Sequence, residues 1–332
     1  MTASRVNGSR NGARSGAHVL TLLSSPLTCQ ILKALSKGPR QQSDLRRAAG
    51  SPAQTTLRAQ LRKLGEIGAI EKRRRNHFPG VVELELSEAG RELLSVTGVI
   101  EGWLALAPGE PLQPGGSAAK AAIKALVEGW STTMLRALAA KPLTLTELDG
   151  VIASLNYPSL ERRLSAMRLA GMIVALPGNS RGTPYGVTDW ARQAVGPLAA
   201  AAQWERRYLP ETTAPIGKVD TEAVFLLAVP LLRLPEEVSG SCRMAAEISN
   251  GKGRSLAGVL VEGQEGRISS CTTRLEGHPD AWASGSTAAW LGAVIESDHG
   301  RLEMGGDCAL ARGLVEGLHE SLFAGMRTRR TY

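Results

Sequence analysis

The chain has 332 residues, of which 43% are hydrophobic and 21% are charged, a composition typical of globular proteins. Its net charge of +8 favours a nucleic acid or another polyanion as partner. No apolar run reaches the roughly 18 residues of a membrane span, and the polar amino terminus lacks the apolar core of a secretory signal. These features argue against membrane contact and predict a cytoplasmic protein of two or three domains.

The placement of charges and cysteines further narrows the kinds of site and the cellular compartment to be expected. Residues 1–110 contain 16 Lys and Arg against 9 Asp and Glu, whereas residues 216–332 contain 12 against 15. The basic character therefore belongs to the earlier part of the chain. The four cysteines are widely separated without CxxC spacing, which argues against a zinc site or a disulfide framework and indicates a reducing compartment. The histidines also lack metal-ligand spacing, so we expect neither a metal nor a cofactor.

Residues 1–16 form a polar, basic arm that we expect to be flexible. Its segment "SRVNGSRNGAR" has two open interpretations, which are mobile contacts to phosphates or a tail without a role. Cys29 lies in the helix expected after the arm. We interpret it as a core residue, with thiol sensing as the alternative.

An internal repeat begins near this cysteine. "CQILKALSKGPRQQSDL" (29–45) aligns with "TTMLRALAAKPLTLTEL" (132–148) at an offset of 103 residues. "TLRAQLRKLGEIGAI" (56–70) aligns with "SLERRLSAMRLAGMI" (159–173) at the same offset, which then drops to 101. A constant offset over two consecutive segments predicts that this part of the chain is duplicated.

Each copy has the same predicted order of elements. A first helix ends at a proline, which cannot continue a helix, and a second helix (42–49 or 145–153) follows. A third helix with apolar residues at helical spacing leads into a β-hairpin and a capped final helix. The hairpins are expected at 70–75 with 81–86 and at 173–176 with 184–187. This order predicts two winged helix-turn-helix domains, over residues 17–110 and 117–210.

Residues 18–207 also carry a family resemblance. "LRAQLRKLGEIGAIEKR" and "VELELSEAGREL" in the first copy, and "GWSTTMLRALAAKPLTLTEL" in the second, resemble the HxlR-type winged-helix transcriptional regulators. Trp130 lies where that family places a tryptophan in its first helix, whereas the first copy has Leu27 there. The hairpin of the second copy departs from the family pattern. The resemblance implies sequence-specific binding to a double-stranded DNA operator.

The third helix and the hairpin of each copy supply the predicted DNA contacts. In the major groove arginine pairs bidentately with guanine and glutamine with adenine, while basic hairpin residues hold phosphates or the minor groove. The alternatives are an ordinary amphipathic helix and a solvated run of charge. The predicted DNA-binding residues are Gln54, Thr55, Arg58, Arg62, Arg73, Arg74, Arg75, Asn76, His77, Ser159, Arg162, Arg163 and Arg181.

Residues 218–326 share nothing with the repeats. The predicted order is an apolar helix broken near Pro230, three strands, a short strand with a helix, a strand and a final helix. "AWASGSTAAWLGAVIESDHGRLEMGGDCALARGLVEGL" resembles the tail of sterol-carrier-protein-2-like (SCP2-like) domains. The resemblance implies an apolar cavity between sheet and helices that binds a hydrophobic small molecule. The predicted ligand-binding residues are Phe225, Leu226, Met244, Val259, Trp282, Trp290, Leu291 and Met304. Plain core packing is the alternative for each of them, and Trp282 and Trp290 are expected to border one cavity.

Together these patterns predict an α+β protein with two winged helix-turn-helix domains in tandem, followed by an α/β SCP2-like domain. We expect a ligand-responsive transcriptional regulator, by analogy a repressor, that acts as a pseudo-dimeric monomer or as a homodimer. Half-sites about 34 Å apart suit this arrangement. Two other hypotheses are a carrier or self-resistance protein that sequesters its ligand and uses its winged helices for protein contacts, and a DNA-repair enzyme. The sequence offers no catalytic set of residues for the enzyme.

Overall fold

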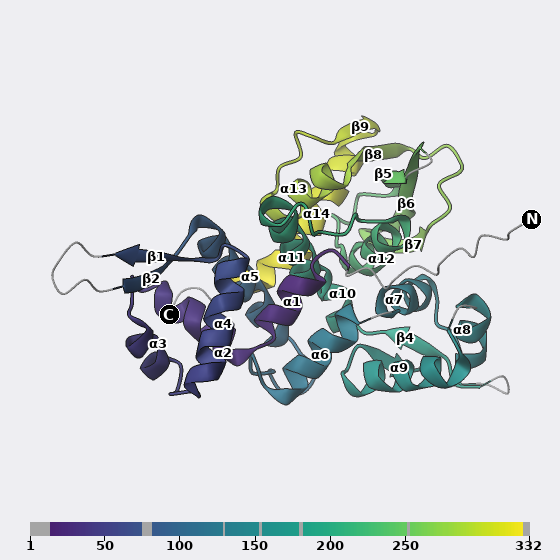
Figure 1. Ribbon diagram of the computed structural model, residues 1–332. Helices are drawn as coiled ribbons and strands as arrows, with labels where there is room; N and C mark the ends of the chain where they lie inside the picture. Colours follow the sequence, from purple (N-terminus) through teal and green to yellow (C-terminus); the bar gives the residue numbers. More distant parts are fainter. Residues whose placement is uncertain are drawn as a thin grey trace, which may run out of the picture.

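The computed structural model describes residues 14–74, 82–128, 130–152, 155–178, 182–250 and 253–327. Within these ranges the chain forms a first unit (residues 17–104), a second unit (117–208) and a C-terminal region (218–327). Figure 1 shows the C-terminal region lying along one side of the two units. In the described part of the chain no helix is long and apolar enough to cross a membrane.

The first unit contains five helices and one hairpin among its described residues. They are α1 (Ala17–Leu23), α2 (Pro26–Leu35), α3 (Gln42–Ala48), α4 (Gln54–Glu66), β1 (Ile70–Arg74), β2 (Val82–Leu86) and α5 (Glu88–Leu104). Gly68 adopts a φ of +69° just after α4, a conformation that favours glycine, and so allows the chain to turn into β1. Ser87 caps α5, because its side chain accepts a hydrogen bond from the Gly90 N–H at 3.0 Å. Local signals thus set both ends of the hairpin.

The second unit has the same order of elements. They are α6 (Ser117–Val127), α7 (Ser131–Ala140), α8 (Leu145–Val151), α9 (Tyr157–Leu169), β3 (Ile173–Ala175), β4 (Tyr185–Val187), α10 (Asp189–Gln193) and α11 (Val195–Tyr208). The expected single final helix is divided here. Pro197 lacks an N–H to donate to the carbonyl of Gln193, so the helix is interrupted at Ala194.

The two units contact each other through a reciprocal exchange of tryptophan hydrogen bonds. Trp103 Nε1 donates to the Trp190 carbonyl at 2.9 Å, and Trp204 Nε1 donates to the Ala89 carbonyl at 2.8 Å. Donor and acceptor positions both differ by 101 residues between the two bonds, which is the offset of the sequence repeat. Trp190 also stacks on Trp103, with ring centroids 4.7 Å apart and planes 7° apart. Equivalent positions therefore make equivalent contacts across this interface.

The C-terminal region is a five-stranded sheet with helices on one face. Its elements are α12 (Lys218–Ala228), the 3-10 helix η1 (Val229–Leu231), β5 (Gly240–Asn250), β6 (Gly253–Gln264), β7 (Arg267–Thr272), β8 (Ala281–Ser286), α13 (Thr287–Glu296), β9 (Glu303–Gly306) and α14 (Cys308–Arg327). The strand order is β7-β6-β5-β8-β9, with β5 and β8 parallel and the other neighbours antiparallel. The α-helix ends before Pro230, as expected.

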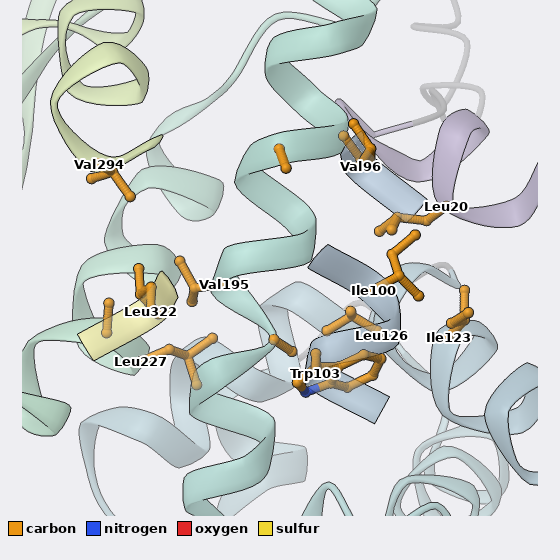
Figure 2. Packing of buried hydrophobic residues seen from close by; sticks show 14 of the residues in the cluster. Leu20, Val96, Ile100, Trp103, Ile123, Leu126, Val195, Leu227, Val294 and Leu322 are labelled. Carbon is orange, nitrogen blue, oxygen red and sulfur yellow. The ribbon is translucent and has the colours of Figure 1, made fainter. Parts of the chain in front are cut away.

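One hydrophobic cluster joins all three parts of the molecule. Figure 2 shows Leu20 of α1, Trp103 of α5 and Leu126 of α6 packed near α11, with Leu227 of α12 and Leu322 of α14 on its other side. Helix α11 thus lies between the first unit and the C-terminal region. Because the core is shared, a change in the packing of α11 affects both neighbours.

Candidate DNA-binding and effector sites

Helix α4 presents one polar face to solvent. Leu57 and Leu64 are fully buried, and Gln60 is buried with its amide donating to the Thr28 hydroxyl at 2.5 Å. The other side of the helix is exposed and carries four of the predicted DNA-binding residues. They are Gln54, Thr55, Arg58 and Arg62. Arg62 lies 3.7 Å from Glu66, whereas Arg58 has no hydrogen-bond or ion-pair partner among the described residues. Arg58 is therefore available to an external acceptor.

Strand β1 extends this basic surface. Ile70 is buried, and the four residues that follow it in the strand are exposed. Lys72 and Arg74 are unpaired within the described ranges, and Arg73 lies 3.3 Å from Glu85 of β2. Both members of that pair are solvent-exposed or partly so, where such pairs contribute little energy. Three further predicted contacts, Arg75, Asn76 and His77, lie outside the described residues.

The second unit offers less to an anion. Arg162 is exposed on α9, as predicted, but Arg163 donates from Nη1 to the Glu128 carbonyl at 2.9 Å. This bond ties α9 to the end of α6 and engages one nitrogen of the Arg163 guanidinium. Ser159 lies in the first turn of α9, where its backbone N–H donates to the Asn156 cap at 3.0 Å. Arg181 lies outside the described residues.

A small apolar cavity lies between α11 and the helices of the C-terminal region. Its volume is about 70 Å³, and its walls are almost wholly apolar. Phe225, Trp290 and Leu291 line it, as predicted. Phe225 and Trp290 meet edge to face, with centroids 4.9 Å apart and planes 86° apart. The Trp290 N–H is satisfied by the Ala245 carbonyl at 2.9 Å, so the indole is held rigidly in the wall.

Five of the predicted ligand-binding residues do not line this cavity. They are Leu226, Met244, Val259, Trp282 and Met304. Leu226, Met244 and Val259 are almost completely buried in the hydrophobic cluster, and Met304 packs against it. They are core residues because the helices close directly onto that face of the sheet.

Contrary to expectation, Trp282 does not line the cavity that Trp290 lines. It pairs in register with Arg243 and Gly305, whereas the buried Met244 pairs with Ala283. Successive strand residues point to opposite faces, so Trp282 lies on the face away from the helices. There its ring covers Gly305, where a Cβ atom would come within 2.6 Å of the indole.

The residues that α11 contributes to the cavity were not predicted from the sequence. Val195 and Ala199 form one wall of the cavity, and Ile216 closes it from the segment before α12. Their apolar spacing is equally consistent with packing inside the second unit. Only the tertiary arrangement shows that they face the C-terminal region.

The thiol of Cys29 is not poised for reaction. It is buried, its Sγ lies 3.3 Å from the Leu23 carbonyl, and burial raises its pKa to about 11. A thiol with this pKa stays protonated at neutral pH and is a weak nucleophile. Within the described ranges, no group of three His, Cys, Asp or Glu side chains could hold a metal ion.

Comparison with known proteins bears on the first unit. The profile of the HxlR-like helix-turn-helix family matches residues 22–108, which include α4 and the β1–β2 hairpin. The uncharacterized HTH-type transcriptional regulator YtcD of Bacillus subtilis (strain 168) is 34% identical over 84 residues. The alignment covers 25% of this chain and 67% of YtcD.

Proposed function

Because the chain belongs to the HxlR-like helix-turn-helix family, we propose that it is a transcriptional regulator that binds duplex DNA through α4 and β1. The observation that carries this proposal is the exposed polar face of α4 with an unpaired Arg58. A helix with such a face fits the major groove, where arginine discriminates guanine by a bidentate hydrogen bond. Lys72, Arg73 and Arg74 next to it suit the phosphates, which fix register and orientation.

The two units support a further element of this proposal, an internal pair that replaces a homodimer. In an isologous interface, if residue i contacts residue j, the equivalent of j contacts the equivalent of i in return. The exchange from Trp103 to Trp190 and from Trp204 to Ala89 has this pattern. One chain would then present two helix-turn-helix units in the arrangement that two subunits give elsewhere.

The C-terminal region would make DNA binding responsive to a small apolar molecule. The cavity is lined by α11 of the second unit and by α12, α13 and α14. A ligand that fits better in one placement of α11 than in another shifts the population of that placement. The competing hypothesis, a carrier that sequesters its ligand, would use the exposed face of α4 for contacts to another protein instead of DNA.

Selection from a randomised duplex library, followed by fluorescence anisotropy, tests the DNA-binding proposal. We expect the selected duplex to bind at least about a thousandfold more tightly than random duplex. Affinity should also fall steeply with salt, because phosphate contacts release counterions. Equal and salt-independent affinity for both duplexes would contradict the proposal and favour the carrier.

A further inference from the structure

A second cavity adjoins the first. Its volume is about 100 Å³, and it lies where the residues before α1 meet α6, α7, α11 and α12. Four residues line both cavities, namely Ala199, Ile216, Val224 and Leu291. These four apolar side chains are thus shared by the walls of both cavities. The joint size of the two cavities is comparable to an apolar cavity of about 150 Å³ that holds benzene.

The second cavity differs from the first in having a polar end. Arg14, Ser15, Thr132 and Asp220 belong to its lining, and the rest is apolar. Arg14 Nη1 and Ser15 Oγ are buried without a hydrogen-bond partner among the described residues. Buried donors without acceptors are uncommon, because each costs free energy that a bound acceptor would recover. The two residues that carry these unpaired donors thus line the same cavity.

The charges around Arg14 bear on what it can hold. Burial is the main cause that lowers the pKa of Arg14, the cation of Arg163 lowers it further, and Asp220 raises it. Asp220 is already engaged, since one of its carboxylate oxygens accepts from the Gly217 N–H at 3.3 Å at the start of α12. A guanidinium remains charged even when buried, so an additional anionic acceptor is favoured at Nη1.

We propose that the two cavities together bind a small apolar carboxylic acid, with its carboxylate on Arg14 and Ser15 and its body against Phe225 and Trp290. The space suits a single aromatic ring or a short alkyl chain. This proposal adds the chemical class of the effector to the proposed function. It rests on that function only for the regulatory role of the site. The proposal gives Arg14, the last basic residue of the expected arm, a role in binding the effector in place of a contact to DNA phosphates.

The position of Arg14 would couple the ligand to the first unit. Arg14 comes three residues before α1, and the N–H groups of Gly16 and Val19 donate to Glu205 of α11 at 2.6 and 2.9 Å. A carboxylate held by Arg14 would hold this segment against α11 and α12. Bound ligand would then add a further link between the start of the first unit and the C-terminal region, beside the hydrogen bonds to Glu205.

Calorimetric titration of the full chain tests the site without DNA. The probes are benzoate, phenylacetate and hexanoate, each beside its neutral amide. We expect at least one acid to bind with a Kd of about 1 mM or lower, and about tenfold more tightly than its amide. The inference is overturned if none of the three acids binds more tightly than its amide.

Variants separate charge from shape. Arg14→Gln should reduce the preference for acid over amide to about twofold or less, and Ser15→Ala should reduce it by a smaller factor. The matched control Arg312→Gln removes an exposed arginine of α14 and should change nothing. Ala199→Leu fills both cavities and should weaken acid and amide alike, with circular dichroism to check folding. If the preference for acid over amide is unchanged in Arg14→Gln, the assignment of Arg14 as the carboxylate-binding residue is wrong.

A separate measurement of DNA affinity distinguishes this inference from the function on which it rests. Acid binding without any change in DNA affinity would leave the site intact and refute its regulatory role. Sequence-specific DNA binding without acid binding would leave the regulator intact and refute the site. A change in DNA affinity caused by the acid should be matched by an equal change in acid affinity caused by DNA.

Discussion

Helices α4 and α9 occupy the same place in their two units, yet they present different chemistry to solvent. Buried Leu57 and Leu64 of α4 correspond to buried Leu160 and Met167 of α9. On the exposed side, Arg58 of α4 corresponds to a glutamate, Glu161. The two helices are therefore alike at their buried positions and differ on their exposed sides.

The two hairpins differ in the same direction. Strand β1 carries Lys72, Arg73 and Arg74, whereas β3 consists of isoleucine, valine and alanine. Exposed apolar side chains gather in the second unit instead, where Leu169 is 88% exposed and Val174 is 46% exposed. Packing constrains which residues can occupy core positions, whereas exposed positions can change to suit a binding partner. Under the proposed function, we therefore expect the first unit to make most of the contacts to DNA.

Substitution of a tryptophan at the interface between the units should give the largest effect, a loss of stability. Trp103→Ala should lower the free energy of unfolding by about 3–5 kcal/mol, because it removes a buried indole that stacks on Trp190. The equivalent change, Trp204→Ala, should cost less, since Ala89 offers no ring to stack upon. Urea unfolding followed by circular dichroism measures both. An equal or larger loss for Trp204→Ala would contradict the asymmetry between the tryptophans.

Substitutions in strand β1 of the first hairpin should give the next largest effect. Replacement of Lys72, Arg73 and Arg74 by alanine should weaken binding to selected and random duplex alike and reduce the salt slope by about 3. Phosphate contacts carry no sequence information, so the loss should not depend on sequence. The matched control is Arg162→Ala with Arg168→Ala in α9. If the control has the larger effect on the salt slope, the second unit holds the phosphates.

A substitution on the exposed face of helix α4 should give a smaller loss of DNA affinity that depends more on the DNA sequence. Arg58→Ala is expected to cost about 1–3 kcal/mol on the selected duplex and much less on random duplex. Glu161→Ala, at the equivalent position of α9, should leave both affinities unchanged. Anisotropy titration with single base-pair variants of the duplex would locate the contact. A uniform loss on every sequence would reassign Arg58 to the backbone.

The smallest expected effect concerns Glu205, which joins α11 to the start of α1. Glu205→Gln should lower the free energy of unfolding by about 1 kcal/mol, because one amide oxygen replaces two carboxylate acceptors. Burial raises the pKa of Glu205 more than its hydrogen bonds lower it. The folded state therefore keeps this proton to higher pH than the unfolded state, whose pKa is about 4.3.

The sign of the pH dependence follows from that direction. As pH rises from the unfolded pKa through the raised folded pKa, the unfolded state loses its proton first, and stability falls. The wild type should fall more steeply over this window than Glu205→Gln, while exposed Glu320→Gln serves as control. Urea midpoints measured across the window decide the matter. Parallel curves for wild type and Glu205→Gln would show that Glu205 does not titrate there.

Local pattern was enough to predict most elements of the first unit, but not the separate helix α1 (Ala17–Leu23) that precedes α2. Leu57 and Leu64 recur at helical spacing, and Ser87 is a good cap, so α4 and the start of α5 follow from neighbouring residues. The exposed position of Arg58 followed from the same periodicity. What the sequence could not reveal was which polar residue finds a partner. Arg163 is bound by Glu128, 35 positions away.

The effector site was predicted less well because it depends on long-range packing. Val195 and Trp290 line one cavity although they are far apart in the chain. The error at Trp282 has a similar origin. Alternation within β8 defines two faces, but only the pairing of Trp282 with Arg243 decides which face is buried. That pairing is fixed by the sheet as a whole.

The tryptophan exchange between the units takes place within one polypeptide. Residues 105–116 connect α5 to α6, so Trp103 and Trp190 meet without an encounter between molecules. A short connection gives an effective concentration in the millimolar range, which dilution cannot lower. Pairing between separate subunits weakens as they become scarce. The contact between the two units would therefore persist when only a few copies of the chain are present in a cell.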